Sequence, residues 1–369
     1  MDNTRYKSNR LIPTCSSSRK QFLALTFIIL TNISCTQSDI STEPAQNLRE
    51  DERLAANTSS SLIQSKEEQD KNSPVGKGNS DISFMYADTD GDKTLDGIEI
   101  CQGTKVCITR GGTHEQIIYS HPSWGGVRII EIQDIDGRAG EEIILHVSDD
   151  EGGFVCLCIV DDAKRLIRTY QDGWRSVLIQ TVADTDGLAG KEIVLLAKDA
   201  RGVLQCLCII HDRNGEVQSY QDGEWASVTS LWSEDTDGSP GMEIVLEIHN
   251  SVDQLYCVCV IHDATRTLMK YANSAWAVGQ IILLTDTDGK TGSEIVLGYR
   301  SSVGSGIAVI HDDKETIRTY AFRGDLPAIQ HVGPSSRHKG NDLCVLVEGN
   351  ELFILAERYE QPVPVEICD

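Results

Sequence analysis

Short apolar runs of four to eight residues recur along the chain from residue 81 onward, separated by polar turn pairs such as Asp-Gly and Asn-Gly. The runs are rich in Val, Ile and aromatic residues, which is typical of β-strands joined by hairpins. Runs such as Cys206 to Asp212 are apolar on both faces, as expected when a sheet is covered on both sides. The pattern predicts an all-β domain over residues 81–369.

One phrase repeats through this domain. It reads Asp-x-Asp-Gly and runs into a Glu-Ile-Val-Leu segment, with starts at Asp134, Asp184, Asp235 and Asp286 and a divergent copy at Asp88. Each repeat contains four expected strands: the Glu-Ile-Val-Leu strand, a cysteine strand, a tyrosine strand and a strand opened by tryptophan. Four strands in about 50 residues, repeated radially, indicate a β-propeller blade. We expect a β-propeller of about five or six four-stranded blades.

The C-terminal segment 343–358 resembles two further strands. We expect it to form a partial blade that pairs with strands between residues 104 and 133 and closes the ring. A solenoid would need capping ends, and nothing at the C-terminus reads as a cap.

Residues 1–35 predict an export signal. Basic residues precede the apolar run 22–30, which is followed by small and polar residues up to Cys35. This order is typical of a bacterial secretory signal peptide, and the run is too short for a membrane span of about 20 residues. The segment from Asn32 to Cys35 resembles a lipoprotein processing box in which the cysteine is acylated. Residues 36–80 lack aromatic residues and cysteine and predict a disordered linker.

The charge of the chain narrows the range of partners. Lys plus Arg number 33 and Asp plus Glu number 56, which gives a net charge of −23. Nucleic acid is therefore not expected as a partner. A protein or a surface glycan stays open as the partner, and contact with a membrane is expected only through a lipid anchor. The predicted location is the bacterial cell envelope or the extracellular space.

The repeated phrase resembles the calcium-loop repeats of the FG-GAP and VCBS families over most of residues 84–333. The resemblance implies an integrin-like propeller whose loops bind Ca²⁺. A calcium ion takes six to eight oxygens at about 2.3 to 2.6 Å, and a tight turn brings alternate residues to one centre. The alternative is that these aspartates only cap turn amides as Asx-turns, without a metal.

The first copy of the phrase has carboxylates at positions one, three, five, nine and twelve, and it also resembles the loop of EF-hands and thrombospondin type 3 repeats. These residues are Asp88, Asp90, Asp92, Asp96 and Glu99. Lys93 stands at the usual glycine, so we expect it in a left-handed conformation at a cost of about 1 to 2 kcal/mol.

The other four copies keep positions one, three and nine. The candidate ligands are Asp134, Asp136 and Glu142; Asp184, Asp186 and Glu192; Asp235, Asp237 and Glu243; and Asp286, Asp288 and Glu294. Their fifth position carries no carboxylate, and a basic residue at Arg138 or Lys290 would oppose a divalent cation.

Three repeats carry a Cys-x-Cys pair on a strand, where both sulfurs face the same side. The pairs are Cys156 with Cys158, Cys206 with Cys208, and Cys257 with Cys259. Two interpretations stay open: disulfides, as suits an exported protein, or buried thiols that act as small core residues. A zinc site is less suited to the one-residue spacing.

Histidine and tryptophan also recur. His211, His262 and His311 are each followed by aspartate, and a residue repeated in every blade more often belongs to a hairpin than to a catalytic site. Trp124, Trp174, Trp225 and Trp276 are expected as packing anchors between blades or, alternatively, as sugar-stacking platforms. No G-x-S-x-G, H-E-x-x-H or phosphate loop is present.

These features together predict an exported, surface-anchored calcium-binding repeat protein that acts as a binding or adhesion module. The alternatives are a lectin-type carbohydrate binder and a secreted polysaccharide-active enzyme. No catalytic constellation supports the enzyme, which would require a unique, non-repeated acid or base cluster.

Overall fold

The computed structural model describes residues 5–7, 84–274, 276–302, 304–324, 326–334, 339–347, 351–355 and 362–365. Residues 8–83, which include Cys35 and the predicted linker, lie outside the described part of the chain. Within the described part, every regular element is a β-strand. None of the described residues form a helix long and apolar enough to cross a bilayer.

The strands form six antiparallel sheets, numbered here as blades 1 to 6 in chain order. Blade 1 contains β2 (Met85–Ala87), β3 (Asp96–Cys101), β4 (Lys105–Thr109) and β5 (Gln116–Tyr119). Blade 2 contains β6 (Gly126–Gln133), β7 (Glu142–Ser148), β8 (Phe154–Asp161) and β9 (Leu166–Tyr170). Blade 3 contains β10 (Ser176–Ala183), β11 (Glu192–Lys198), β12 (Leu204–His211) and β13 (Glu216–Tyr220).

The second half of the chain continues in the same order. Blade 4 contains β14 (Ser227–Glu234), β15 (Glu243–His249), β16 (Leu255–His262) and β17 (Thr267–Tyr271), and β1 (Arg5–Lys7) pairs antiparallel with β17. Blade 5 contains β18 (Val278–Thr285), β19 (Glu294–Ser301), β20 (Gly304–His311) and β21 (Thr316–Phe322). Blade 6 contains β22 (Ala328–Pro334), β23 (Asn341–Val347), β24 (Glu351–Leu355) and β25 (Val363–Val365).

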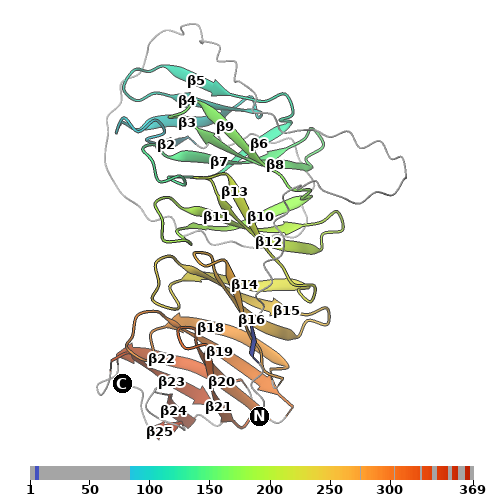
Figure 1. Cartoon of the computed structure of the whole chain (residues 1–369), viewed down its shortest axis with the longest axis vertical. Coiled ribbons are helices and arrows are strands. Elements are labelled where there is room, and N and C mark those ends of the chain that lie inside the picture. Colours follow the sequence, from blue (N-terminus) through green and yellow to red (C-terminus); the bar gives the residue numbers. More distant parts are fainter. Residues whose placement is uncertain are drawn as a thin grey trace.

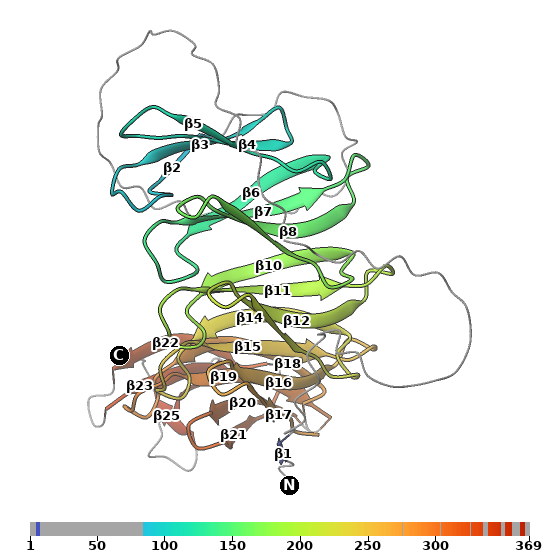
Figure 2. The ribbon, with the colours of Figure 1, turned by 45° about the horizontal axis from the view of Figure 1, so that its top comes forward.

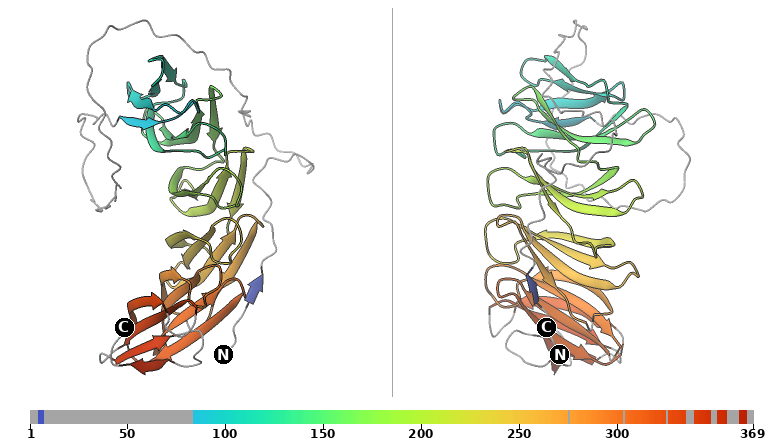
Figure 3. Two further views of the ribbon diagram at one scale, coloured as in Figure 1. Left: turned by 90° about the vertical axis from the view of Figure 1, so that its left-hand side faces the viewer. Right: turned by 45° about the vertical axis from the view of Figure 1, so that its right-hand side comes forward.

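The all-β, propeller-like succession of four-stranded blades is confirmed, with six sheets in the described chain. Figure 1 shows blade 1 at the top and blade 6 at the bottom of the long axis. Figures 2 and 3 show the same stack from other sides, as a curved column. Among the described strands, no pairing joins blade 1 to blade 6.

The expected closure of the ring by the C-terminal segment is wrong. Strands β23 and β24 pair with each other and with β22 and β25, inside blade 6, and not with strands between residues 104 and 133. The reason is that blade 6 has its own first strand, β22, and blade 1 has its own first strand, β2. Neither end sheet therefore lacks a strand that the other would supply.

The boundary between blades falls at the tryptophans. Trp174 lies in the connection between β9 and β10, and the strand that it opens pairs with β11 of the following blade. Its indole is 2 % exposed and packs among Ile144 and Leu157 of blade 2 and Leu195 of blade 3. Trp124, Trp225 and Trp276 lie in the corresponding clusters. The packing-anchor interpretation is therefore confirmed, and these four buried indoles offer no face to a sugar.

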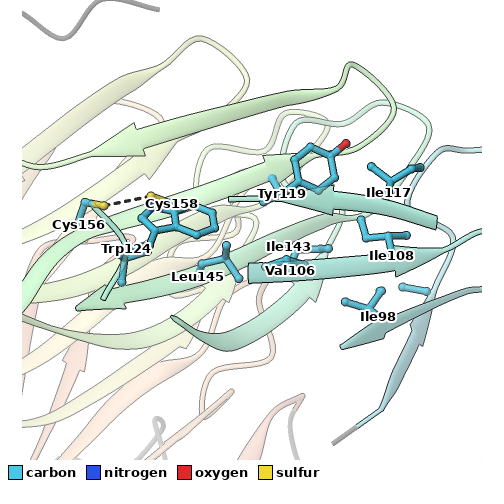
Figure 4. Packing of buried hydrophobic residues seen from close by; sticks show 13 residues of the cluster. Ile98, Val106, Ile108, Ile117, Tyr119, Trp124, Ile143, Leu145, Cys156 and Cys158 are labelled. Carbon is cyan, nitrogen blue, oxygen red and sulfur yellow. Dashed lines mark hydrogen bonds between the residues drawn. The ribbon is translucent and has the colours of Figure 1, made fainter. Parts of the chain in front are cut away.

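Apolar cores lie between neighbouring blades. Figure 4 shows the first core, where Ile98 and Val106 of blade 1 meet Ile143 and Leu145 of blade 2. The central strands are buried on both faces; in β11, for example, Ile193, Val194 and Leu195 are all 0 % exposed. Each such side chain contributes about 1.5 to 3 kcal/mol on burial, so stacking against both neighbours supplies most of the stability of a blade.

The loops that carry the repeated phrase stack on one another. The amide of Met242 donates to the Asp184 carbonyl (2.8 Å), which links the loop of blade 4 to that of blade 3. Gly187 has φ 73° and faces Pro240 of the next loop so closely that an added Cβ would lie 2.6 Å from it. Both the backbone conformation and the close approach require glycine at the fourth position of the phrase. The phrase loops thus form a continuous row along the column.

Candidate metal centres at the blade junctions

The first aspartate of each phrase caps its own turn. The Gly187 amide donates to Asp184 Oδ1 at 2.7 Å, and the Gly238 amide donates to Asp235 Oδ1 at 2.6 Å. The same bond, from the fourth residue to the first, occurs in the phrases that begin at Asp88, Asp134 and Asp286. The Asx-turn interpretation describes Asp184, Asp235 and Asp286, whereas Asp88 and Asp134 also belong to groups that could hold a metal ion.

The third and ninth positions divide their oxygens between the turn and a common centre. In blade 3, Asp186 Oδ1 accepts the Leu188 amide (2.9 Å) and Glu192 Oε2 accepts the Thr185 amide (2.7 Å). The second oxygens, Asp186 Oδ2 and Glu192 Oε1, lie near His211. Each carboxylate is therefore oriented by the loop, with one oxygen directed towards the imidazole.

The strand register brings the histidine to this centre. Ile193 of β11 pairs with Ile210 of β12. The first residue of β11, Glu192, therefore lies next to the last residue of β12, His211. His211 Nδ1 lies 3.6 Å from Asp186 Oδ2 and 3.7 Å from Glu192 Oε1, and its Nε2 lies 3.3 Å from Asp263 Oδ2 of blade 4.

The same group recurs in blades 4 and 5. His262 Nδ1 lies 3.3 Å from Asp237 Oδ2 and 3.6 Å from Glu243 Oε1, and its Nε2 lies 3.1 Å from Asp312 Oδ2. In blade 5, His311 Nδ1 lies 3.4 Å from Glu294 Oε1, and Asp288 belongs to the same group. In all three blades the ligand atoms of one Asp, one Glu and one His lie within 4.8 Å of one another.

The spacing of these atoms suits a bound ion. Charge-assisted hydrogen bonds are about 2.7 to 2.9 Å long, so most of the Nδ1 distances are long for a direct bond to carboxylate. Two tetrahedral ligands about 2.0 to 2.2 Å from one metal ion are separated by about 3.3 to 3.6 Å, which is close to the observed spacing. When one ring nitrogen of a histidine binds a metal ion, the other usually donates its N–H to a carboxylate or a carbonyl. Asp263 lies in this position beside His211 Nε2.

The charges of the cluster favour a cation. Burial opposes the charged form of His211, but the nearby carboxylates of Asp263 and Glu192 outweigh burial and raise its pKa to about 10. The same balance, with Asp312 and Glu243, raises the pKa of His262 to about 10. Three carboxylates face each imidazole, so a protonated ring still leaves a formal charge of −2 (three negative, one positive). The cluster therefore favours a positive charge at Nδ1.

Blade 1 replaces the histidine with Arg110. Its Nη1 lies 2.7 Å from Asp90 Oδ2 and 3.0 Å from Asp96 Oδ2, and its Nη2 lies 2.6 Å from Asp162 Oδ2 of blade 2. The side chain of Arg110 is only 7 % exposed. A permanent cation thus stands beside the acidic group in which the sequence predicts calcium.

The first loop gathers part of its predicted ligand set. Asp88 joins Asp90 and Asp96 in one group, whereas Asp92 Oδ1 accepts the Thr94 amide at 2.7 Å on the exposed side of the loop. Glu99 lies three residues after Asp96 on β3, so the alternation of the strand directs it to the opposite face. Lys93 has φ 71°, the left-handed conformation expected from the sequence.

Blade 2 replaces the histidine with a carboxylate, Asp161. Lys164 Nζ bridges Asp136 Oδ2 (2.5 Å) and Asp161 Oδ2 (2.6 Å), and Asp134 belongs to the same acidic group. Burial, with the charges of Asp136 and Asp161, raises the pKa of Glu142 to about 8, although the Ile135 amide donates to it. The donors here are all oxygens, and the Lys164 side chain is 33 % exposed.

The aspartate after each histidine ties the previous blade to its own. Asp263 of blade 4 accepts the Thr185 hydroxyl (2.6 Å) and the Tyr220 hydroxyl (3.1 Å), both from blade 3. Asp312 of blade 5 likewise accepts hydrogen bonds from the hydroxyl groups of Thr236 and Tyr271 of blade 4. The His-Asp pair therefore serves two blades: the histidine faces its own loop, and the aspartate faces the loop before it. Sequence reasoning assigned both residues to the hairpin alone.

The cysteines divide into two classes. Cys101 and Cys107 form a disulfide between β3 and β4, and Cys344 is also disulfide-bonded. The six cysteines of the three Cys-x-Cys pairs are buried in the cores, and no disulfide joins them between blades in the described chain.

Comparisons with known proteins give no assignment by sequence. No protein-family model and no curated protein matches the chain. Among solved structures, AofleA from Arthrobotrys oligospora is 10% identical, with 78% of this chain and 87% of that chain covered and a TM-score of 0.28. The rhamnogalacturonan lyase YesW is 10% identical, with 76% and 72% covered and a TM-score of 0.28. Likenesses of this size give no information about activity.

Proposed function

We propose that this chain is an exported binding module whose stacked blades are cross-linked by divalent metal ions at the Asp-Glu-His clusters of blades 3, 4 and 5. The observation that carries the proposal is the threefold recurrence of one donor set. In each blade a third-position Asp, a ninth-position Glu and a His approach within 4.8 Å. A catalytic site is one constellation, whereas a repeated site with the same neighbours is what a structural role requires.

The donor set guides the choice of metal. One imidazole nitrogen with two carboxylates suits a borderline ion such as Zn²⁺ or Mn²⁺ better than Ca²⁺, which prefers oxygen. The calcium expected from the FG-GAP and VCBS resemblance fits best in blade 2, where oxygens of Asp134, Asp136 and Glu142 form one group and Asp161 contacts the same ammonium as Asp136. The Lys164 ammonium already lies between two of these carboxylates, and its partly exposed side chain is able to leave.

A bound ion would act by rigidifying the column. It would join the phrase loop to the end of the third strand in one blade, and through His211 Nε2 and Asp263 it would reach the next blade. A rigid column presents loops of successive blades in a fixed row to a protein or a glycan. Export and attachment through Cys35 would hold this row at the cell envelope.

The test is a measurement of metal content and thermal stability on the full chain. We expect metal analysis of the purified protein to find Zn²⁺ or Mn²⁺, and we expect a chelator to lower the unfolding midpoint. A ligand present at 100 times its dissociation constant adds about 2.7 kcal/mol, so re-addition of each metal alone identifies the fitting ion.

Variants locate the effect. His211→Gln with His262→Gln should reduce the metal content and the Zn²⁺-dependent shift, whereas His146→Gln, on β7 and outside the clusters, should leave both unchanged. Asp136→Asn with Asp161→Asn should remove a Ca²⁺-dependent shift only. A protein that retains no metal and gains no stability from any of the three ions would refute the proposal.

A further inference from the structure

Three pairs of cysteine thiols lie side by side on strands of blades 2, 3 and 4. The Sγ atoms are 3.0 Å apart in Cys156 and Cys158, 2.7 Å in Cys206 and Cys208, and 3.0 Å in Cys257 and Cys259. All six side chains are at most 6 % exposed. Figure 4 shows the first pair beside Trp124. The metal clusters do not use these sulfurs.

Blades 1 and 5 show that packing alone does not require a pair of cysteines at these places. In blade 5 the strand register puts Gly306 and Ala308 at the two positions, so a small side chain without sulfur fits both. In blade 1 the register puts Lys105 and Cys107 there, and Cys107 is already bonded to Cys101. Cysteine thus occupies both positions in blades 2, 3 and 4 and neither position in blade 5. In blade 1 it occupies one position, where it is bonded to a cysteine outside the pair. Cysteines chosen only for their size would have no reason to occur in pairs.

We propose that each Cys-x-Cys pair is oxidised to an intrastrand disulfide in the exported protein. A disulfide of the exporting compartment, RSSR, supplies the oxidant. One cysteine thiolate attacks RSSR and releases RSH; the second cysteine then attacks the mixed disulfide and releases another RSH. The two cysteines lose two electrons and two protons, and RSSR is reduced to two RSH.

The geometry allows this bond. Residues two apart on a strand have Cα atoms about 6.6 Å apart, and disulfides span about 4.4 to 6.8 Å. Each bond therefore forms near the upper limit of span, which makes it easier to reduce than a typical structural disulfide. Oxidation precedes stacking of the blades, because afterwards the sulfurs are buried.

The chain allows a direct peptide test. Cleavage after Lys and Arg places the pairs on three separate peptides, 139–164, 202–213 and 214–266. The full chain is produced in an oxidising export compartment, denatured with iodoacetamide present, and digested. We expect all three peptides without alkylation and lighter than the dithiol form by two hydrogen atoms. After dithiothreitol treatment, each should take up two alkyl groups.

Other outcomes overturn the proposal. Two alkyl groups on each peptide before reduction would show that the thiols stay reduced. Linked peptides, such as 139–164 joined to 202–213, would show bonds between blades. A mass increase of the native protein by copper, with both thiols alkylated after the metal is removed, would show a metal site.

Two variants serve as controls. Cys156→Ala should leave Cys158 fully alkylated, because its partner is gone. Cys206→Gly with Cys208→Ala copies blade 5, and the remaining two pairs should still oxidise. The wild-type peptide map stands even if a variant fails to fold.

Discussion

His211 Nε2 lies 3.3 Å from Asp263 Oδ2, across the junction between blades 3 and 4. Asp263 also accepts hydroxyl groups from Thr185 and Tyr220 of blade 3. Burial disfavours its charge, but the hydrogen bonds and charge of His211 outweigh burial, and the pKa of Asp263 falls below its usual value. This carboxylate therefore links three polar side chains of blade 3 to blade 4.

Asp263→Ala should therefore destabilise the protein strongly. The change leaves His211, Thr185 and Tyr220 without their buried acceptor, and breaking such a buried charged pair costs about 3 to 5 kcal/mol. Urea unfolding measures the loss. Asp253→Asn is the matched control, because the Asp253 side chain is 87 % exposed, and its effect should stay within about 0.5 kcal/mol. Equal effects of the two changes would contradict the role of Asp263.

The metal-free protein should lose stability as the pH rises. The pKa of His211 and of His262 is about 10 in the folded chain against about 6.5 when unfolded, so the folded form binds extra protons between these values. Their contribution is fully present below pH 6.5 and is lost as the pH rises through 10. Each histidine removes at most about 1.4 kcal/mol per pH unit in this window.

Metal should reverse this slope. A metal ion must displace the proton on Nδ1, so its stabilising effect grows with pH. Unfolding midpoints from pH 6 to 9.5, with chelator and with Zn²⁺, measure both slopes. Parallel curves would show that no ion competes with the proton at these histidines.

Lys164→Met should make blade 2 depend on calcium. Without Ca²⁺, removal of the ammonium leaves buried Asp136 with Arg138 at 3.9 Å and buried Asp161 with Arg168 at 3.3 Å, so the unfolding midpoint should fall. With Ca²⁺ the midpoint should recover, and the calcium-induced shift should exceed that of the wild type. Arg165→Met offers a control, since Arg165 Nε lies 4.0 Å from Asp162, outside this site. A variant that Ca²⁺ fails to restore would exclude calcium from blade 2.

Gly187→Ala should cost more than Gly215→Ala. Both glycines have φ 73°, so the backbone cost of about 1 to 2 kcal/mol is common to the two changes. A Cβ on Gly187 would meet Pro240 of the next loop at 2.6 Å, whereas a Cβ on Gly215 meets nothing within 4 Å. The difference in unfolding free energy therefore measures the stacking of the phrase loops. No difference would mean that the loops separate without cost.

The sequence predicted much of the fold because its signals are local. Runs with strand composition and Asp-Gly turns identified four strands per repeat, and the recurring tryptophans identified packing anchors. The blade boundary was less accessible, because the apolar pattern does not say whether the strand after Trp174 pairs with the strand before it or after it. The short phrase loop between Ala183 and Glu192 makes that choice, since it joins neighbouring antiparallel strands.

The candidate sites depend on long-range register, which spacing does not contain. The pairing of Ile193 with Ile210 puts His211 beside Glu192, although 19 residues separate them (211 minus 192). The first loop shows the opposite case. Its carboxylates follow the EF-hand spacing, but β3 begins at Asp96, so Glu99 faces away, and Arg110 comes from the end of β4 to fill the centre.

The His-Asp pair also gives the column a direction. The clusters of blades 3 and 4 take the acceptor for the second histidine nitrogen from the blade that follows in the chain: His211 from Asp263, and His262 from Asp312. A growing chain therefore always carries one incomplete junction at its C-terminal end, and each new blade completes the junction behind it. The order in which the junctions become complete is thus the order in which the blades are synthesised.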